Sequence, residues 1–144
     1  MAITHFTPQI ISRGEGRSVV LAAAYRHAAR MEHQAEARVV DYSAKRGLAH
    51  EEFSLPPDAP DWMKALVADC TVAESSEAFW NRVEAFEQRA DAQLAREFII
   101  ALPVELDQTQ NIALVRAFVA EQVLTRGQIA DWVYHDDRAI RMSI

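Results

Sequence analysis

The chain has 144 residues, half of them apolar and a quarter charged, which is the composition of an ordinary globular domain. No apolar run is long enough to span a bilayer, and the first residues lack the charged and apolar segments of a signal peptide. A lone cysteine, Cys70, excludes an internal disulfide and a cysteine-based zinc site, and it predicts a reducing, cytoplasmic setting. The length predicts one domain over residues 1–144.

The charge is unevenly distributed along the chain. The net charge of −6 argues against a nucleic-acid partner when it is taken alone. Residues 1–50, however, hold seven Lys and Arg against four Asp and Glu, whereas residues 51–144 hold eight against seventeen. Because local charge decides whether a groove can follow a phosphate backbone, the N-terminal third is the part that we expect to contact DNA.

The pattern of apolar residues predicts a mixed α+β domain. Residues 2–11 are rich in β-formers and predict a strand, and an Ala-rich helix is expected over residues 18–33. Pro56, Pro57 and Pro60 interrupt regular structure. The other expected elements are strands at 39–42 and 48–55, two helices within 62–93, a buried strand at 94–102, a helix at 108–125 capped by Asp107, and a strand at 129–135. This order lacks regular βαβ repetition and favours a sheet covered by helices.

The loop before the first helix carries the residues of greatest chemical interest. Its glycines allow close approach to a partner, and Arg13 and Arg17 offer forked donors to phosphate. Ser18 is placed to cap the following helix, which carries Tyr25 beside Arg26. A phenol among cations near a phosphate-binding loop is a candidate nucleophile for phosphoryl transfer. The alternative is that the tyrosine only packs a capped amphipathic helix, as most helical aromatic residues do.

Three stretches together resemble one family: ISRGEGRS followed by AAAYR, the middle DAQLAREFIIALPVEL, and the late ADWVYHDD. They are similar to the N-terminal nicking domain of MobA/MobL relaxases, which include the TraA-type relaxases of conjugative plasmids. The resemblance implies an antiparallel, HUH-relaxase-like sheet flanked by helices. It implies an enzyme that nicks one strand of plasmid DNA at an origin of transfer, recognising single-stranded or hairpin DNA with accessory relaxosome proteins.

The resemblance also assigns roles to individual residues. Tyr25 aligns with the tyrosine that attacks the scissile phosphate and stays joined to the 5′ end. His135 aligns with the first of three histidines that hold a divalent metal, Mn, Mg or Zn. Glu97 lies in the middle motif and is a candidate for orienting a metal-bound histidine; a solvated strand carboxylate is the alternative. A phenol is mostly protonated at neutral pH and needs nearby positive charge to attack well.

Several basic residues near Tyr25 are candidates for phosphate contacts. For each of them the alternative is a solvated surface charge. His27 and His33 lie close to Tyr25 in sequence and are further candidates for touching DNA, and His5 on the first strand is expected to be satisfied within the sheet. The predicted DNA-binding residues are Arg13, Arg17, Arg26, Lys45 and Arg46.

Residues 138–144 depart from the family pattern. The family continues after HDD with a segment like Pro-Gly-Asn-Pro-His-x-His, which supplies the second and third metal histidines, and this chain reads RAIRMSI instead. Within codon degeneracy, restoring one base lets the same DNA encode the family segment, so we hypothesise a single-base deletion that the coding DNA would confirm or refute. We expect a sheet that lacks a central strand, weak metal binding, and weak or absent nicking.

Three functions therefore remain open from the sequence. The chain is an impaired DNA-nicking tyrosine transesterase, a non-catalytic remnant that binds single-stranded or hairpin DNA, or an inert fragment of a mobile element. Salt-dependent binding to single-stranded DNA separates the second from the third.

Overall fold

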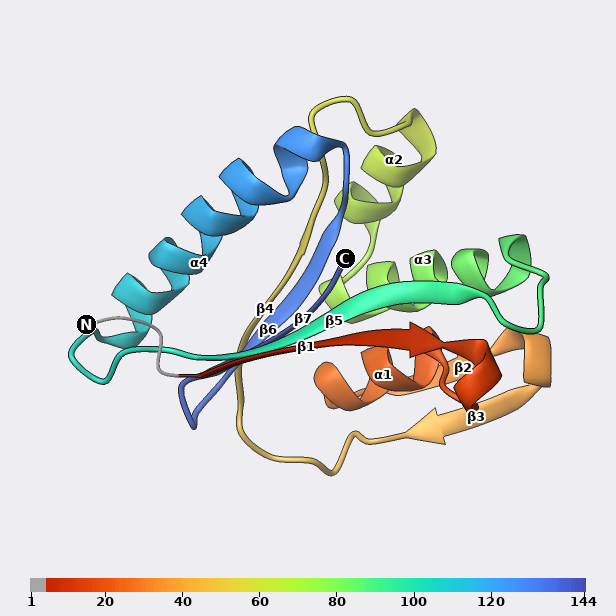
Figure 1. The fold of residues 1–144 in the computed structure, drawn as a ribbon, viewed down its shortest axis with the longest axis horizontal. Helices are drawn as coiled ribbons and strands as arrows, with labels where there is room; N and C mark the ends of the chain where they lie inside the picture. Colours follow the sequence, from red (N-terminus) through yellow and green to blue (C-terminus); the bar gives the residue numbers. More distant parts are fainter. Residues whose placement is uncertain (1–4) are drawn as a thin grey trace.

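A computed structural model describes residues 5–144, apart from the side chain of His5, and shows a five-stranded antiparallel sheet (Figure 1). The strand order is β1-β5-β7-β6-β4, and a separate hairpin pairs β2 with β3. The bounds in the order of the sheet are β1 (His5–Ser12), β5 (Gln93–Ala101), β7 (Ala139–Ser143), β6 (Ala130–His135) and β4 (Leu48–Ser54). Within the described part of the chain, the antiparallel α+β fold expected from the sequence is confirmed.

Helices cover both faces of the sheet. One face carries α1 (Val19–Arg26), α3 (Val72–Phe86) and the hairpin of β2 (Arg30–His33) and β3 (Arg38–Asp41), with α2 (Asp61–Asp69) against α3. The other face carries α4 (Gln108–Gln122). Three short 3₁₀ helices complete the fold: η1 (Arg13–Glu15), η2 (Gln34–Glu36) and η3 (Leu124–Arg126). None of the described helices is long and apolar enough to cross a bilayer.

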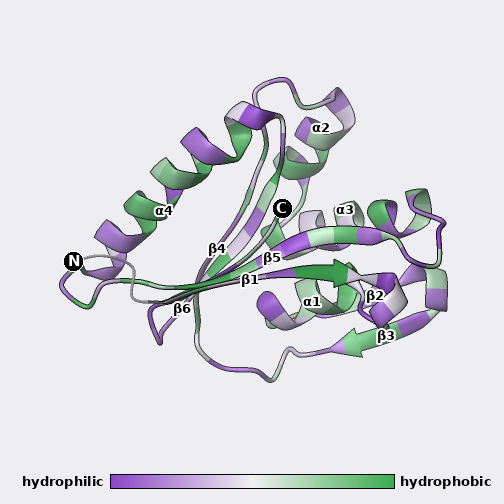
Figure 2. Cartoon of the chain, viewed as in Figure 1, coloured by the Kyte–Doolittle hydropathy of each residue, from purple (hydrophilic) through white to green (hydrophobic). Residues whose placement is uncertain are grey.

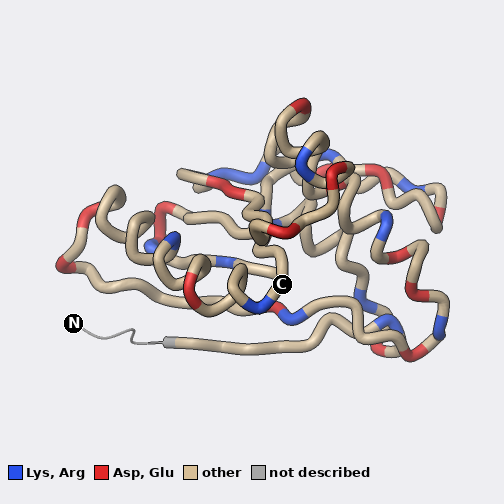
Figure 3. Tube along the Cα trace, turned by 90° about the horizontal axis from the view of Figure 1, so that it is seen from above, with Lys and Arg blue, Asp and Glu red and all other residues tan. Residues whose placement is uncertain are grey.

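The hydrophobic core of the described residues consists of two clusters, one on each face of the sheet. Trp132 and Tyr134 are buried on the α4 side, where they pack in one cluster with the buried residues of that helix. Apolar and polar residues alternate along α4 (Figure 2), and the apolar Val115 and Val119 are among those buried in this cluster. Because successive side chains of a strand point to opposite faces, the neighbours of Trp132 point toward α1 and α3 instead. Charged residues of both signs are interspersed along the trace (Figure 3).

Helix capping follows the sequence closely. The Asp107 side chain accepts from the backbone N–H of Gln110, and the Gln110 side chain accepts from the backbone N–H of Asp107, so the expected cap of α4 is confirmed as a capping box. Thr71 and Glu74 form the same arrangement at α3. The chain leaves η3 at Gly127, whose φ of 72° is a conformation that glycine adopts without strain.

The first helix is shorter than predicted. Instead of continuing to residue 33, α1 ends at Arg26, and the chain turns through Ala28, whose φ is 50°, into β2. Residues 30–33 alternate between exposed and buried, with Met31 and His33 buried, which is the period of a strand. Ala-rich composition predicted continuous helix here, but tertiary contacts of the residues after Arg26 prevail over that propensity.

The predicted gap in the sheet is wrong. Residues 139–143 form β7, which lies at the centre of the sheet between β5 and β6. Ala139, Ile140 and Met142 are buried, and the pairing continues beyond the strand because Ile144 and Arg96 exchange two backbone hydrogen bonds of 3.0 and 3.1 Å. The tail alternates in the way a central strand requires, although it lacks the family's histidines.

The strands expected at 39–42 and 48–55 are also present, as β3 and β4, but they belong to different sheets. β3 pairs with β2, whereas β4 pairs with β6 at the edge of the main sheet. The strands expected at 94–102 and 129–135 are confirmed as β5 and β6, and the two helices expected within 62–93 are confirmed as α2 and α3. Residues 2–4 of the first expected strand lie outside the described part of the chain.

Candidate functional site

Tyr25 lies in the last turn of α1, with 48% of its surface exposed. Its ring meets Tyr42 edge-on, with the two ring centroids 5.3 Å apart. On another side, Lys45 places its ammonium 3.9 Å from the ring centroid and donates to the backbone carbonyl of Tyr25 at 3.1 Å. The tyrosine is therefore held by an aromatic neighbour and a cation while much of its ring remains accessible.

The loop that precedes α1 carries a second cation, Arg17. Gly16 has a φ of 74° and turns the chain out of η1, and Ser18 then caps α1 by accepting from the backbone N–H of Val20 at 3.1 Å. Between them, Arg17 donates to Glu97 on β5 at 3.0 Å. The loop is thus attached to the sheet by an ion pair whose side chains are 34% and 18% exposed.

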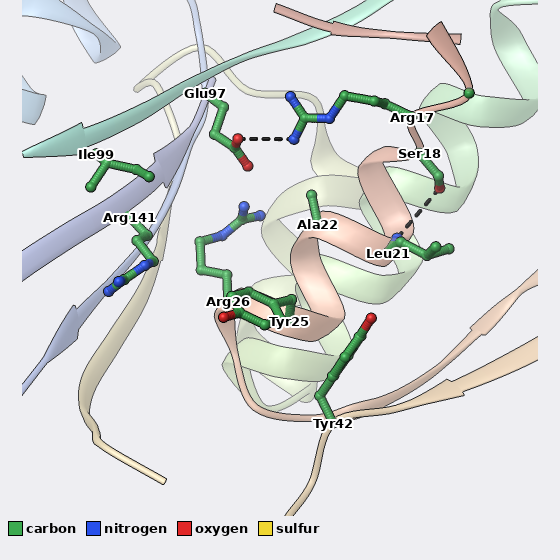
Figure 4. A pocket seen from close by; sticks show the side chains of 11 residues that line it. Arg17, Ser18, Leu21, Ala22, Tyr25, Arg26, Tyr42, Glu97, Ile99 and Arg141 are labelled. Carbon is green, nitrogen blue, oxygen red and sulfur yellow. Dashed lines mark hydrogen bonds and ion pairs between the residues drawn. The ribbon is translucent and has the colours of Figure 1, made fainter. Parts of the chain in front are cut away.

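A cavity of about 350 Å³ opens beside Tyr25, between α1 and the sheet (Figure 4). Three of its polar residues are arginines and one is a carboxylate. The polar residues used below are Arg17, Tyr25, Arg26, Tyr42, Glu97 and Arg141.

A buried charge network supports the helix from behind. Asp131 on β6 is completely buried and accepts from Arg26 at 2.7 Å and from His27 at 2.5 Å. Ser76 and Trp80 of α3 also donate to this carboxylate, and Arg26 donates further to Ser143 on β7 at 2.9 Å. The end of α1 is therefore joined to β6, β7 and α3 at one point.

The network fixes the charge states of its members. Burial opposes ionisation of Asp131, but the charges of Arg26 and His27 outweigh it and hold the pKa of this carboxyl well below its usual range. Burial likewise opposes the charge on His27, yet the carboxylates of Asp131 and Glu51, 2.9 Å away, raise the pKa of His27 above its usual value. Because both ring nitrogens face carboxylates, the protonated imidazole is the form that satisfies both.

His135, the predicted metal ligand, lies at the end of β6 and is 5% exposed. Its Nε2 is buried, and no described atom forms a hydrogen bond with it. Burial and the nearby charges of Lys45 and Arg141 lower the pKa of His135, while the backbone carbonyl of Arg26 acts in the opposite direction. The imidazole is therefore neutral at ordinary pH, which is the form that binds metals.

The residues around His135 nevertheless do not fit a divalent metal. Among the described residues, no group of three His, Cys, Asp or Glu lies close enough together to hold an ion. The charged neighbours that lower the pKa of His135 include the cations Lys45 and Arg141, and they would repel a metal ion in the same way. A single imidazole beside two cations is not the donor set that transition metals require.

The structure gives the predicted DNA-contact residues different surroundings. Arg26 is 2% exposed and committed to Asp131, so it is a structural residue and not a surface phosphate contact. Arg13 donates to Glu84 and to backbone carbonyls at the end of α3, including that of Glu87, and thereby caps that helix. His27 and His33 are buried at 3% and 2% exposure and do not face solvent DNA.

Arg17, Lys45 and Arg46 remain available for the role predicted from the sequence. Arg17 lines the Tyr25 cavity, Lys45 lies over the Tyr25 ring, and Arg46 is exposed on the segment before β4. Glu97 also faces the cavity, but its hydrogen bond is to Arg17, and it makes no contact with His135 among those seen in residues 5–144. The orienting role predicted for Glu97 therefore has no contact in this structure that supports it.

Sequence reasoning missed three residues of this site. The sequence pattern indicates Tyr42 only as a strand residue, Asp131 as part of an alternating strand, and Arg141 as part of a tail that departs from the family pattern. An acidic residue within an otherwise apolar strand was the available signal for Asp131, because a buried carboxylate needs partners. No local signal distinguishes Tyr42 or Arg141, since both reach the cavity through tertiary structure.

The geometry described above places a tyrosine at the end of a helix, over an antiparallel sheet and beside a cavity lined by three arginines. Comparison with known proteins gives the family. The MobA/MobL family model matches residues 17–142, and the chain belongs to this family of conjugal transfer and mobilisation relaxases.

Individual relatives agree with this assignment. The chain is 64% identical over 137 residues to the conjugal transfer protein TraA of Agrobacterium fabrum, covering 95% of this chain and 12% of that protein. It is 36% identical to the mobilization protein MobL of Acidithiobacillus ferridurans over 97% of this chain and 34% of that protein. A solved structure described as the "Molecular Basis of Vancomycin Resistance Transfer in Staphylococcus aureus" superposes with a TM-score of 0.81 at 30% identity, covering 99% of this chain and 68% of its own. The chain thus spans about an eighth of the length of this TraA protein.

Proposed function

We propose that this chain is the nicking domain of a plasmid relaxase and that Tyr25 is its nucleophile. The observation that carries the proposal is the position of Tyr25, half exposed at the edge of a cavity that Arg17 and Arg141 line. Lys45 over the ring adds a third cation. Positive charge at this point stabilises the negative charge that develops on a phosphate under attack.

The proposed reaction is a transesterification that conserves the number of phosphodiester bonds. The oxygen of Tyr25 forms a bond to the scissile phosphorus and loses its proton to solvent. The bond between that phosphorus and the 3′ oxygen breaks, and the leaving 3′ oxygen takes up a proton. The 5′ end of the cut strand remains on Tyr25. Arg17 and Lys45 stabilise the charge on the non-bridging oxygens.

The proposed substrate is single-stranded or hairpin DNA at an origin of transfer, as the family and the names of the relatives suggest. Accessory proteins of the transfer complex are further proposed partners. Since the described residues offer no three-ligand metal site, we propose that nicking by this chain is slow.

A covalent adduct tests the proposal. The protein is incubated with a labelled single-stranded oligonucleotide carrying the transfer origin of a TraA-encoding plasmid, and the products are separated on a denaturing gel. The wild-type protein forms a band that retains both protein and label, and Tyr25→Phe does not form it. Tyr42→Phe is the matched control, because it removes a neighbouring hydroxyl and retains the ring contact. An adduct that persists in Tyr25→Phe would refute the assignment of the nucleophile.

The second candidate is a DNA-binding domain without catalysis. The observation that favours it is the single imidazole, His135, in surroundings that do not fit a metal. This candidate predicts salt-dependent binding of the same oligonucleotide and no adduct with any divalent cation.

A further inference from the structure

We propose that Arg141 binds a non-bridging oxygen of a DNA phosphodiester in the Tyr25 cavity, so that this site binds a phosphate without a divalent metal. The proposal rests on the proposed function in that it takes DNA as the ligand, but it concerns binding and not cleavage.

The position of Arg141 is fixed by the centre of the sheet. Its backbone lies in β7, opposite Ile99 of β5 on one side and Val133 of β6 on the other. Ile99 and Arg141 line the same cavity as Tyr25 (Figure 4). An arginine on the middle strand of a five-stranded sheet has little backbone freedom, so the point from which its side chain starts is fixed beside the cavity.

The guanidinium of Arg141 has N–H donors that form no good hydrogen bond within the described part of the chain. Its Nη1 is buried, and it has no hydrogen-bond partner within the described part of the chain. Its Nη2 lies 3.6 Å from Asp137, which is too far for a good hydrogen bond, and the Asp137 side chain is 58% exposed. A buried, unmatched donor on a charged group is costly, and a phosphate oxygen supplies the missing acceptor.

Other charges at the cavity favour the same ligand. Burial and the charge of Arg141 lower the pKa of Lys45, and the exposed carboxylate of Asp137, 3.6 Å from Arg141, acts in the opposite direction without cancelling them. Glu97 is the carboxylate in the lining, and its hydrogen bond goes to Arg17. An anion placed at Arg141 and Lys45 relieves their mutual repulsion, whereas a cation increases it.

Binding to a short single strand in the absence of metal tests this site. The probe is fluorescein-labelled hexathymidylate, measured by anisotropy in EDTA at low salt. Arg141→Gln is expected to weaken binding by about 10-fold or more, because a charge-assisted hydrogen bond is lost. The slope of log affinity against log salt should fall by about one. Arg126→Gln, which makes the same charge change on an exposed residue of η3, should change affinity by less than about twofold.

A second measurement uses the wild-type protein, so it remains valid even if the Arg141→Gln variant does not fold. In EDTA, addition of hexathymidylate should shift the side-chain Nε–H resonance of Arg141 and leave that of Arg126 in place. Binding that requires Mn²⁺, equal losses in the two variants, or an unmoved Arg141 resonance would each overturn the proposal.

These outcomes are separate from those of the nicking assay. Metal-free, Arg141-dependent binding without any adduct upholds the phosphate site and refutes the nicking function. An adduct on Tyr25 together with binding that requires Mn²⁺ upholds the nicking function and refutes the phosphate site.

Discussion

Arg26 donates to Asp131 across 2.7 Å, and this buried ion pair joins the helix that carries Tyr25 to the strand that carries His135. An isolated helix of eight residues has little stability in water, so the position of α1 depends on its tertiary contacts. His27, directly after the helix, reaches the same carboxylate. The place of the tyrosine relative to the cavity is therefore determined largely by one acidic residue on the sheet.

Replacing Asp131 should destabilise the fold strongly. Asp131→Asn keeps the size of the side chain but leaves the charge of Arg26 buried without a counter-charge, and it leaves His27 with the carboxylate of Glu51 alone. Breaking a buried ion pair from one side costs about 3–5 kcal/mol, which we expect to measure by urea denaturation. Glu36→Gln is the control, because it breaks the Arg38–Glu36 pair, whose side chains are 53% and 54% exposed, and should cost less than about 1 kcal/mol. Equal losses in the two variants would show that Asp131 does not hold the helix in place.

The stability of the protein should depend on pH through His27. Its pKa is raised in the folded state, so its contribution is complete below the ordinary histidine value of about 6.5 and is lost as pH rises through the higher folded value. The free energy of unfolding should therefore fall as pH rises from about 6.5 through the raised folded pKa of His27. The pKa of His135 is lowered in the folded state, so this residue changes the free energy of unfolding only below about pH 6.5. It therefore does not contribute to the pH dependence above that value.

The matching measurement is denaturation at several pH values in wild type and in His27→Gln. The variant should be less stable at the lower end and should lose most of the dependence on pH above about pH 6.5. A slope unchanged by the substitution would mean that another group titrates.

Helix caps and individual strands could be predicted from the sequence. Asp107 and its capping box, the continuous apolar run of β5, and the alternation of β6 all follow from patterns of a few residues, and each is found in the structure. The glycine loop and Ser18 likewise predict the start of α1, and Ser18 caps that helix in the structure. Features that depend on neighbours in the chain are the ones that such patterns encode.

Contacts between residues far apart in the chain could not be predicted from the sequence. Ala-rich composition favoured helix through residue 33, but His27 is held by Asp131, more than a hundred residues away in the chain. Arg26 looked like a surface cation for the same reason, since its partner lies on a distant strand. The missing histidines of the tail predict a gap, yet backbone pairing in a sheet needs no particular side chain, and Ile140 and Met142 are buried together on the α4 face.

The central position of β7 predicts a large effect of a substitution in the tail. Ile140 is completely buried between α4 and the sheet, so Ile140→Ala should cost about 2–5 kcal/mol in urea denaturation. Ile10→Ala removes the same atoms from an edge strand at a site that is 41% exposed, and should cost less than about 1 kcal/mol. If both variants lost the same small amount, residues 139–143 would not be part of the folded core.

A substitution of Glu97 distinguishes an effect on DNA binding from a role in the cleavage reaction. Glu97→Gln removes the carboxylate that pairs with Arg17 and leaves the cavity more positive. Because that pair is partly exposed, we expect hexathymidylate to bind about 2- to 5-fold more tightly in EDTA, which corresponds to less than about 1 kcal/mol. Glu105→Gln, an exposed site before α4, makes the same charge change away from the cavity and should have no comparable effect. A Glu97→Gln variant with unchanged affinity but a slower adduct rate would instead assign this carboxylate to the reaction.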